Sequence, residues 1–289
     1  MAAMRWKLDY SYTGTGARRK KIRGRVTAQA KLEPCPFRST RLASRLIQRE
    51  SIMRMISVLT LLVGLFLGLA AASAQPRQII ILRHGEKTDG PDLCPTGFLR
   101  AKALAEVYLG KGAAQSLFGA ERPAAFYAIT DHTRETIEPS AKSWGMQLLL
   151  PATDKSKFTN KIEGENRETE DAAKDVLTNP SFGGKIVVMT WEHKHIANKD
   201  LDSEYQDPPV TLRRLLNLDQ YAKHHPDVKI PETWSGDNYD YFWIVDYADP
   251  KSAMPTKVKI LKQTFPAPYE SVPANDWKEP EPRLEGCKQ

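Results

Sequence analysis

The sequence has only three cysteines in 289 residues, no internal repeat and a single long apolar run. This run, residues 56–72, is uncharged and 17 residues long. A transmembrane helix needs about 20 residues, so the run is slightly short for one. Arg54 precedes the run and the small residues 72–74 follow it, which is typical of a cleaved secretory signal peptide. We therefore expect cleavage near Ala74 and a periplasmic or secreted protein.

The lead-in to this run is too long for an ordinary signal peptide. Residues 1–52 are basic, and Met53 and Met55 stand where a signal peptide would start. We therefore expect a signal peptide over residues 53–74 and interpret the basic leader as the product of a misplaced start codon. The alternative is an uncleaved signal anchor, with its basic arm held in the cytoplasm by the positive-inside rule.

The exported part also lacks an excess of positive charge. The whole chain carries 42 Lys and Arg and 35 Asp and Glu, a formal net charge of +7. Residues 1–74 hold 14 of the basic and three of the acidic residues, so residues 75–289 hold 28 and 32 and carry −4. The high isoelectric point therefore belongs to the leader, and we expect no nucleic-acid partner.

Residues 75–265 form one predicted domain in which strands and helices alternate. Strands are expected at 78–83, 125–130, 147–150, 185–191, 239–247 and 257–265, and helices at 96–108, 133–144, 168–177 and 209–217. Alternation of this kind predicts an α/β fold with a mostly parallel central sheet flanked by helices. Residues 152–166 are polar and without periodicity, so we expect a loop excursion that shapes specificity. Residues 266–289 are rich in Pro, Glu and Lys and predict an irregular tail.

Residues 82–86 (LRHGE) directly follow the apolar residues 78–81 and carry the clearest chemical signal. They place Arg83, His84 and Gly85 at the carboxyl end of a buried strand, where open α/β sheets bind ligands. This combination suits phosphate chemistry, because the imidazole can attack phosphorus while the guanidinium holds the oxygens. The glycine allows the backbone to come close to the ligand.

Three further segments complete a resemblance to the histidine phosphatase superfamily, which is also called phosphoglycerate mutase-like. They are residues 93–101 (LCPTGFLRA), 132–139 (HTRETIEP) and 187–193 (VVMTWEH). Residues 191–195 (WEHKH) and 234–240 (WSGDNYD) are also similar to a poorly characterised, exported bacterial branch of that superfamily. The resemblance implies a three-layer α/β/α fold, with helices on both faces of the sheet.

The resemblance also implies roles for individual residues. His84 would be the nucleophile and carry a transient phosphohistidine. Arg83 and His193 would hold the phosphoryl oxygens and spread the charge that develops as the P–O bond breaks. No metal or other cofactor is implied, because fixed cations stabilise that charge. The predicted function is hydrolysis of a small phosphate ester.

One motif departs from the family pattern at a phosphate-binding position. The family has an arginine where this chain has His132, and an imidazole lacks the guanidinium fork. Arg134 lies two residues further on and is the second candidate to bind phosphate. If this segment is a loop, Arg134 reaches the pocket. If the helix has already begun, the two side chains diverge by about 200° and Arg134 points elsewhere.

The proton donor is the least determined part of the predicted site. Some relatives place an aspartate directly after the second histidine, but here Lys194 occupies that position. Candidate donors are the acidic residues near the first motif and in the excursion: Glu86, Asp89, Glu163, Glu165 and Glu168. We select Glu86 as the catalytic acid, because the chain fixes it beside the nucleophile.

Two cysteines remain after removal of the leader, since Cys35 lies within it. In an oxidising compartment Cys94 and Cys287 can pair and tie the tail to the region of the active site. The sequence alone does not give the distance between them. It gives no oligomeric state either, and no stable membrane partner is expected unless the signal remains uncleaved.

Two alternatives stay open at this point. The first is a catalytically weak relative that binds a phosphorylated or anionic ligand, because His132 replaces an arginine and the acid is uncertain. The second is a metal site built on His193 and His195, completed by His84 or an aspartate. On a strand, two histidines in this spacing would point to one face.

Overall fold

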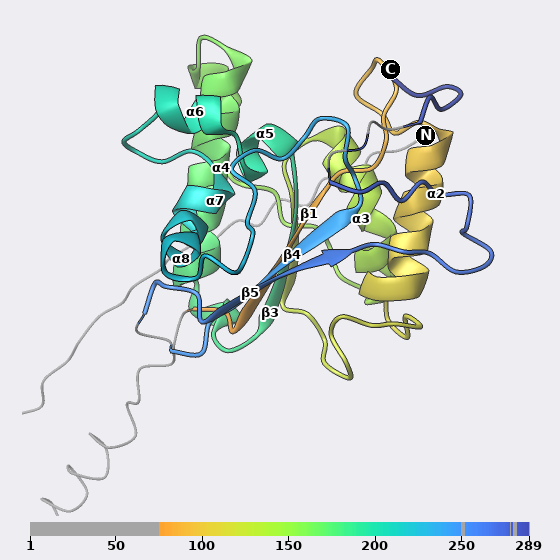
Figure 1. Ribbon diagram of the computed structural model, residues 1–289, viewed down its shortest axis with the longest axis horizontal. Helices are drawn as coiled ribbons and strands as arrows, with labels where there is room; N and C mark the ends of the chain where they lie inside the picture. The colour runs from red at the N-terminus through yellow and green to blue at the C-terminus, as the bar shows by residue number, and fades with distance from the viewer. Residues whose placement is uncertain (1–74, 250–251, 278, 280–281, 289) are drawn as a thin grey trace, which may run out of the picture. The chain divides into compact units, whose positions relative to one another are not determined.

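The computed structural model describes residues 75–249, 252–277, 279 and 282–288 (Figure 1). The predicted leader and signal peptide lie outside these residues. The described chain is built on a five-stranded sheet with the order β2-β3-β1-β4-β5. Its strands are β1 (Gln78–Arg83), β2 (Ala125–Ala128), β3 (Ile186–Trp191), β4 (Tyr241–Asp246) and β5 (Lys257–Lys262).

Strand β1 lies at the centre of the sheet. It pairs in parallel with β3, which pairs in parallel with β2. Strand β4 is antiparallel to both β1 and β5, so it alone runs against the other four. The predicted mostly parallel sheet is confirmed. Ile79, Ile80, Ile81 and Leu82 are all fully buried, which explains why the sequence of β1 is a continuous apolar run instead of an alternating one.

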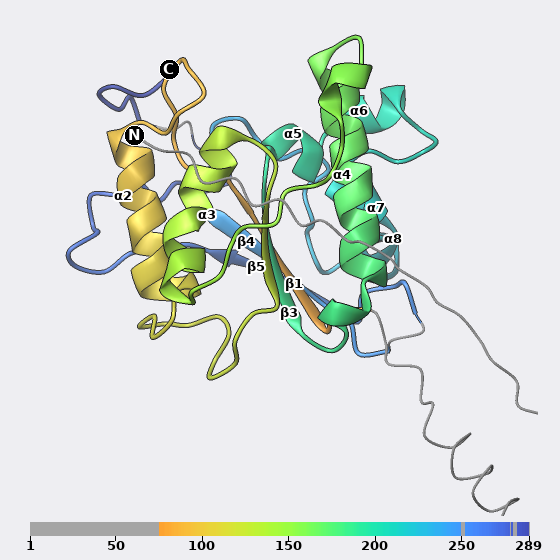
Figure 2. The same cartoon turned by 180° about the vertical axis from the view of Figure 1, so that it is seen from behind.

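Helices cover both faces of the sheet, as Figures 1 and 2 show. Because strand side chains alternate, Ile80 and Leu82 pack against α2 (Pro95–Leu104), the π-helical turn η1 (Ala105–Leu109) and α3 (Asp131–Ser143). On the opposite face, Ile79 and Ile81 pack against α4 (Lys161–Thr178), α7 (Leu212–Leu215) and α8 (Leu218–His224). Two short helices, α5 (His193–Ile196) and α6 (Lys199–Glu204), follow β3.

Helix α4 is longer than the sequence predicts. It begins at Lys161 instead of residue 168, so the predicted excursion is partly helical. Asn160 caps the helix by accepting a hydrogen bond from the backbone of Glu163 (2.9 Å). Its first turns bury Glu165, Asn166 and Glu168, so no apolar periodicity marks them. The strand predicted at 147–150 is wrong in extent, because it forms only a bridge between Tyr127 and Leu149.

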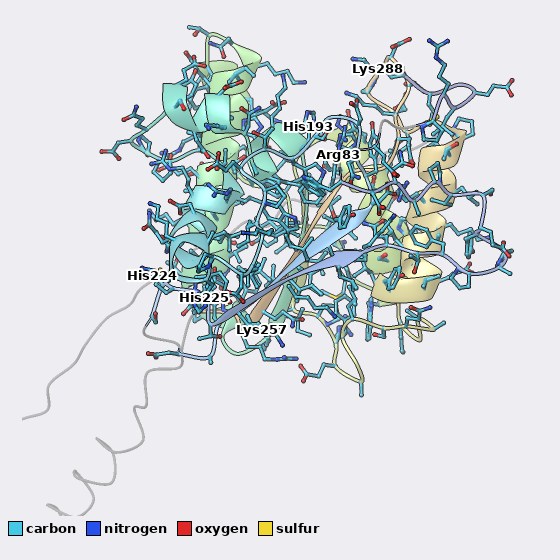
Figure 3. The ribbon with its side chains drawn as sticks, in the orientation of Figure 1. Arg83, His193, His224, His225, Lys257 and Lys288 are labelled. Carbon is cyan, nitrogen blue, oxygen red and sulfur yellow. A yellow bond between two sulfur atoms is a disulfide. The ribbon has the colours of Figure 1, made fainter. Side chains whose placement is uncertain are left out.

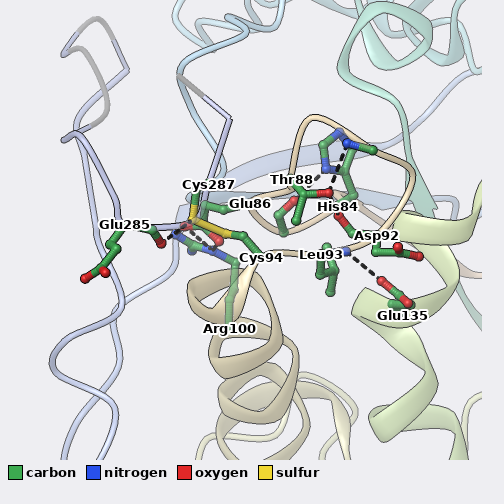
Figure 4. Close-up of a disulfide and its surroundings, with 12 residues drawn as sticks. His84, Glu86, Thr88, Asp92, Leu93, Cys94, Arg100, Glu135, Glu285 and Cys287 are labelled. Carbon is green, nitrogen blue, oxygen red and sulfur yellow. Dashed lines mark hydrogen bonds and ion pairs between the residues drawn. A yellow bond between two sulfur atoms is a disulfide. The ribbon is translucent and has the colours of Figure 1, made fainter.

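The described residues after position 265 form no helix or strand, but they contact the domain closely. Tyr269 and Val272 are buried in the core on the α2 side of the sheet. Cys287 forms a disulfide with Cys94, with their Cα atoms 5.1 Å apart (Figure 4), so the predicted pairing is confirmed. No helix in the described part of the chain combines the length and apolar character needed to cross a membrane.

Candidate functional site

The site forms where parallel strands end at one edge of the sheet. Arg83, the last residue of β1, is in register with Trp191, the last residue of β3. The residues that follow these strands, His84 and then Glu192 and His193, are therefore neighbours. In Figure 3, Arg83 and His193 lie beside each other at this edge. Helix α3 follows β2 and adds His132 from its first turn.

His84 is enclosed and held in one orientation. Its side chain is 1% exposed, and Nδ1 donates a hydrogen bond to the carbonyl of Gly85 (2.6 Å). Burial lowers the pKa of His84 to about 4, so the ring is neutral near pH 7. With its proton on Nδ1, the ring keeps a lone pair on Nε2. Gly85 is required here, because a Cβ would lie 3.1 Å from the carbonyl oxygen of Gly97 in α2.

Arg83 lines a cavity of 540 Å³ at this edge of the sheet, and it also anchors a loop. Its Nη1 donates to the carbonyls of Gly236 (2.6 Å), Asn238 (2.9 Å) and Ser235 (3.3 Å). The guanidinium carbon lies 3.7 Å from the centre of the Tyr239 ring, a cation–π contact. Arg83 therefore connects β1 to residues 235–239 and places a fixed positive charge beside His84.

His193 begins α5 and lines the same cavity. Its Nδ1 is buried and has no hydrogen-bond partner among the described residues. Burial, followed by the charge of Arg83, lowers the pKa of His193 to about 3. The ring is therefore neutral near pH 7 and is not a fixed cation, so it can accept or donate a hydrogen bond.

Glu192 contacts both His84 and His132, and the sequence analysis did not identify it. Its Oε2 lies 3.4 Å from Nε2 of His84, and its Oε1 accepts a hydrogen bond from the Thr130 hydroxyl (2.9 Å). Burial raises the pKa of Glu192, but the contacts with His132 and His84 outweigh it and hold the pKa below its usual range. Glu192 could have been predicted from its position between β3 and His193, at the edge where β1 also ends.

His132 reaches the site through Glu192. Its Nδ1 donates to the carbonyl of Pro91 (3.0 Å), and its Nε2 forms a short hydrogen bond with Oε1 of Glu192. Because two acceptors cannot share a hydrogen bond, one proton is held between His132 and Glu192. The His132 and His84 rings meet edge to face, with centroids 4.3 Å apart.

Arg134 points away from this group. Its side chain is half-exposed and pairs with Asp131 across one helical turn (3.3 Å). Helix α3 begins at Asp131, so the alternative in which the helix has already begun is the one observed. Arg134 lines a neighbouring cavity of 960 Å³ instead of the cavity that contains Arg83 and His193.

Glu86 is placed differently from its predicted catalytic role. Arg100 donates to both of its carboxylate oxygens (2.6 and 3.0 Å), and Arg100 also pairs with Asp240 (2.8 Å; Figure 4 shows Glu86 and Arg100). Burial raises the pKa of Glu86, but Arg100 outweighs it, so the carboxylate stays ionised. A carboxylate held in this way has no proton to donate near neutral pH, so the choice of Glu86 as the acid is corrected.

Glu165 differs from Glu86 in that its pKa is raised overall. It is buried on α4, it lines both cavities, and burial raises its pKa. Within the described chain it forms ion pairs with Lys161 (3.3 Å) and His195 (3.8 Å). Of the other candidates, Glu168 pairs with Lys155 (3.0 Å) and Asp89 is exposed.

A cavity of 540 Å³ opens at this edge of the sheet. Its cationic walls come from Arg83, Lys87, Lys161, Lys194 and Lys288, and its carboxylates from Glu86, Glu165, Glu192 and Asp237. The tail forms one wall, where the backbone of Lys288 donates to the carbonyl of Lys87 (2.7 Å) beside the disulfide. The five cationic side chains exceed the four carboxylates, so this cavity beside His84 suits an anionic ligand.

Comparison with known proteins finds similarity among solved structures. Neither a protein-family profile nor a curated protein matches the chain. A crystal structure from Agrobacterium tumefaciens, provisionally assigned as the phosphohistidine phosphatase SixA, is similar with a TM-score of 0.36 and 15% sequence identity. The similarity covers 65% of this chain and 97% of that one.

Proposed function

We propose that this protein is an exported phosphomonoesterase that transfers a phosphoryl group from its substrate to Nε2 of His84 and then to water. One observation carries the proposal: His84 is neutral, and its Nδ1 is fixed on the Gly85 carbonyl (2.6 Å), so the lone pair is on Nε2. The adjacent cavity has basic walls. These are the requirements of nucleophilic attack on a phosphate ester.

The first step forms the N–P bond and breaks the ester P–O bond. The lone pair of His84 Nε2 attacks phosphorus, and the leaving oxygen departs with the bonding electrons. The Gly85 carbonyl stabilises the positive charge that grows on the ring through its bond to Nδ1–H. Arg83 offsets the negative charge of the phosphoryl oxygens, and His193 binds one of them. Glu192 must turn aside first, because its Oε2 lies 3.4 Å from Nε2.

Glu165 is the proton donor in this proposal. An alkoxide leaving group needs a proton, and the best donor near neutral pH is a carboxyl whose pKa is raised. Glu165 meets that condition and lines the cavity, whereas Glu86 is held ionised by Arg100. In the second step the Glu165 carboxylate takes a proton from water as the water oxygen attacks phosphorus. The N–P bond then breaks, and inorganic phosphate and neutral His84 are restored.

Two further parts of the proposal have separate support. Export is supported by the signal-like residues 53–74 and by the Cys94–Cys287 disulfide, because such bonds persist in oxidising compartments. Independence from metals is supported by the fixed cations of the site, which supply the charge that a metal would otherwise provide.

The test is hydrolysis of p-nitrophenyl phosphate by the disulfide-bonded chain that begins at Gln75, from about pH 4 to pH 8. We expect turnover that persists in EDTA and falls at least about 10⁴-fold in His84→Ala. Turnover no greater than that of His84→Ala at every pH would contradict the proposal.

One observation favours a second candidate, a weakly catalytic protein that binds an anionic ligand. Glu192 contacts the nitrogen that must attack, and His132 bonds to Glu192 and Pro91 where the family has an arginine facing phosphate. In this case His84→Ala retains most of its affinity for inorganic phosphate in calorimetry, and neither protein turns over substrate.

A further inference from the structure

Glu192 joins His84 and His193 beside the cavity, and phosphate binding does not require this carboxylate. A ring nitrogen of His84, a carboxylate oxygen of Glu192 and a ring nitrogen of His193 all lie within 4.8 Å of one another. We propose that these residues form a binding site for a divalent transition-metal ion such as Zn²⁺, and that the bound ion blocks the nucleophile. The inhibitory part of this inference rests on the proposed function, whereas the binding part does not.

The spacing suits a small metal ion. Zinc binds nitrogen and carboxylate ligands at about 2.0–2.2 Å, which places neighbouring ligand atoms of a tetrahedral site about 3.4 Å apart. His84 Nε2 and Glu192 Oε2 already have this separation, at 3.4 Å. His193 begins the short helix α5, and one of its ring nitrogens lies within 4.8 Å of both atoms, near a third ligand position.

The surroundings orient the ligands as metal sites usually do. Nδ1–H of His84 is bound to the Gly85 carbonyl (2.6 Å), which fixes the ring and directs the Nε2 lone pair outward. The second oxygen of Glu192 is held by Thr130 (2.9 Å) and by His132. His193 has a buried Nδ1 without a hydrogen-bond partner in the described chain, and a metal bound to this nitrogen would satisfy it.

The donor atoms select the kind of ion. Two imidazoles and one carboxylate favour Zn²⁺ or Cu²⁺ over Mg²⁺ and Ca²⁺, which prefer oxygen ligands. Glu192 and His193 line the cavity, so the ion has an entry path and a position left for water. His195 is not a ligand, because its Nε2 bonds to Asn166 (2.9 Å) and α5 is a helix instead of a strand. The metal site predicted on His193 and His195 is therefore replaced by one formed by His84, Glu192 and His193.

The bound ion inhibits the enzyme because it competes with the substrate phosphorus for Nε2 of His84. Nε2 of His84 cannot hold a metal and attack phosphorus at the same time. Arg83 carries positive charge beside the same ring, so it favours the phosphate anion and opposes the cation. Phosphate and Zn²⁺ therefore exclude each other, and each should weaken the apparent affinity of the other.

The test measures Zn²⁺ binding and inhibition in parallel on the exported protein, with a chromophoric chelator as competitor. We expect one Zn²⁺ per chain, with affinity lowered at least about tenfold in Glu192→Gln and in His193→Asn. Asp237→Asn is the matched control, because it removes an exposed carboxylate from the same cavity and should keep its affinity. Mg²⁺ and Ca²⁺ should neither bind at this site nor inhibit.

The outcomes separate this site from the proposed function. Stoichiometric Zn²⁺ binding that both variants lose, in a protein without turnover, supports the site and contradicts the phosphatase. Turnover with no Zn²⁺ binding, or with binding that neither variant changes, overturns the site and leaves the phosphatase intact. If Glu192→Gln folds poorly, the rise in thermal stability that Zn²⁺ gives to the unmodified protein should still be absent in His193→Asn.

Discussion

Two buried carboxylates near His84 have opposite surroundings. Glu86 is 2% exposed at its side chain, and it is held by Arg100, which also pairs with Asp240. Glu192 is 13% exposed and is shared between His84 and His132. The first belongs to a closed network in which fixed charges compensate each other. The second has titratable partners instead of a fixed cation, although both carboxylates line the cavity.

The partners of an acidic residue determine whether it can take part in chemistry. A carboxylate that an arginine holds on both oxygens keeps one charge state, so it supports the structure around the nucleophile. A carboxylate between two imidazoles can exchange protons or bind a metal. Glu165 is a third case, because burial raises its pKa and its partners do not outweigh that effect.

The strongest effect should come from Glu165→Gln. This change removes the proposed proton donor, so hydrolysis of alkyl phosphates should fall about 10²–10⁴-fold. p-Nitrophenyl phosphate should be affected less, because its leaving group needs less protonation. In the unmodified protein, turnover of alkyl phosphates should fall as the pH rises through the raised pKa of Glu165, and the variant should lack this decline. Equal losses on both substrates would contradict the assignment.

Breaking the closed network should affect folding. Arg100→Met leaves Glu86 and Asp240 buried without their cation, so the free energy of unfolding should fall by about 3–5 kcal/mol. Urea unfolding followed by circular dichroism measures this. Glu192→Gln, which keeps the shape of the side chain, should lose much less. If the two variants lost the same stability, the contrast between the carboxylates would be wrong.

Opening the disulfide should have the next largest effect. The Cys94→Ser, Cys287→Ser double variant frees the tail that forms one wall of the cavity, and stability should fall by about 2–5 kcal/mol. Reducing agent should produce the same shift in the unmodified protein and none in the double variant. A reducing agent that lowered the stability of both proteins equally would show that another group is responsible.

The smallest effect is expected for Arg134→Ala. The side chain is half-exposed and contacts Asp131 on the surface of α3, so stability should change by less than about 0.5 kcal/mol. Turnover of p-nitrophenyl phosphate should stay close to that of the unmodified protein. A large rise in KM would return Arg134 to the phosphate-binding role first predicted for it.

The sequence predicts the parts of the fold that apolar pattern determines. Strands β1 and β3 are continuous apolar runs, and the histidines that follow them are brought together as expected. Helix α4 starts earlier than predicted because its buried first turns are polar and lack an apolar stripe. The orientation of Arg134 depends on where α3 begins. A shift of two residues in the start of this helix reverses the direction of the side chain.

The contacts that distinguish the acidic residues are not readable from the sequence. Arg100 lies 14 residues from Glu86 and reaches Asp240 only after the late strand β4 has returned beside β1. Glu192 meets His84 through the parallel register of β1 and β3, and local sequence does not encode that register. Proximity along the chain favoured Glu86 as the acid, whereas the fold places Glu192 against His84.

The most direct test is to trap the phosphorylated protein. The protein is mixed with p-nitrophenyl phosphate, quenched rapidly in alkali to preserve phosphohistidine, and examined by mass spectrometry of the intact chain and its peptides. We predict one phosphoryl group on His84, absent in His84→Ala and retained in Asp237→Asn. A phosphoryl group on another residue, or turnover without any trapped intermediate on His84, would contradict the account.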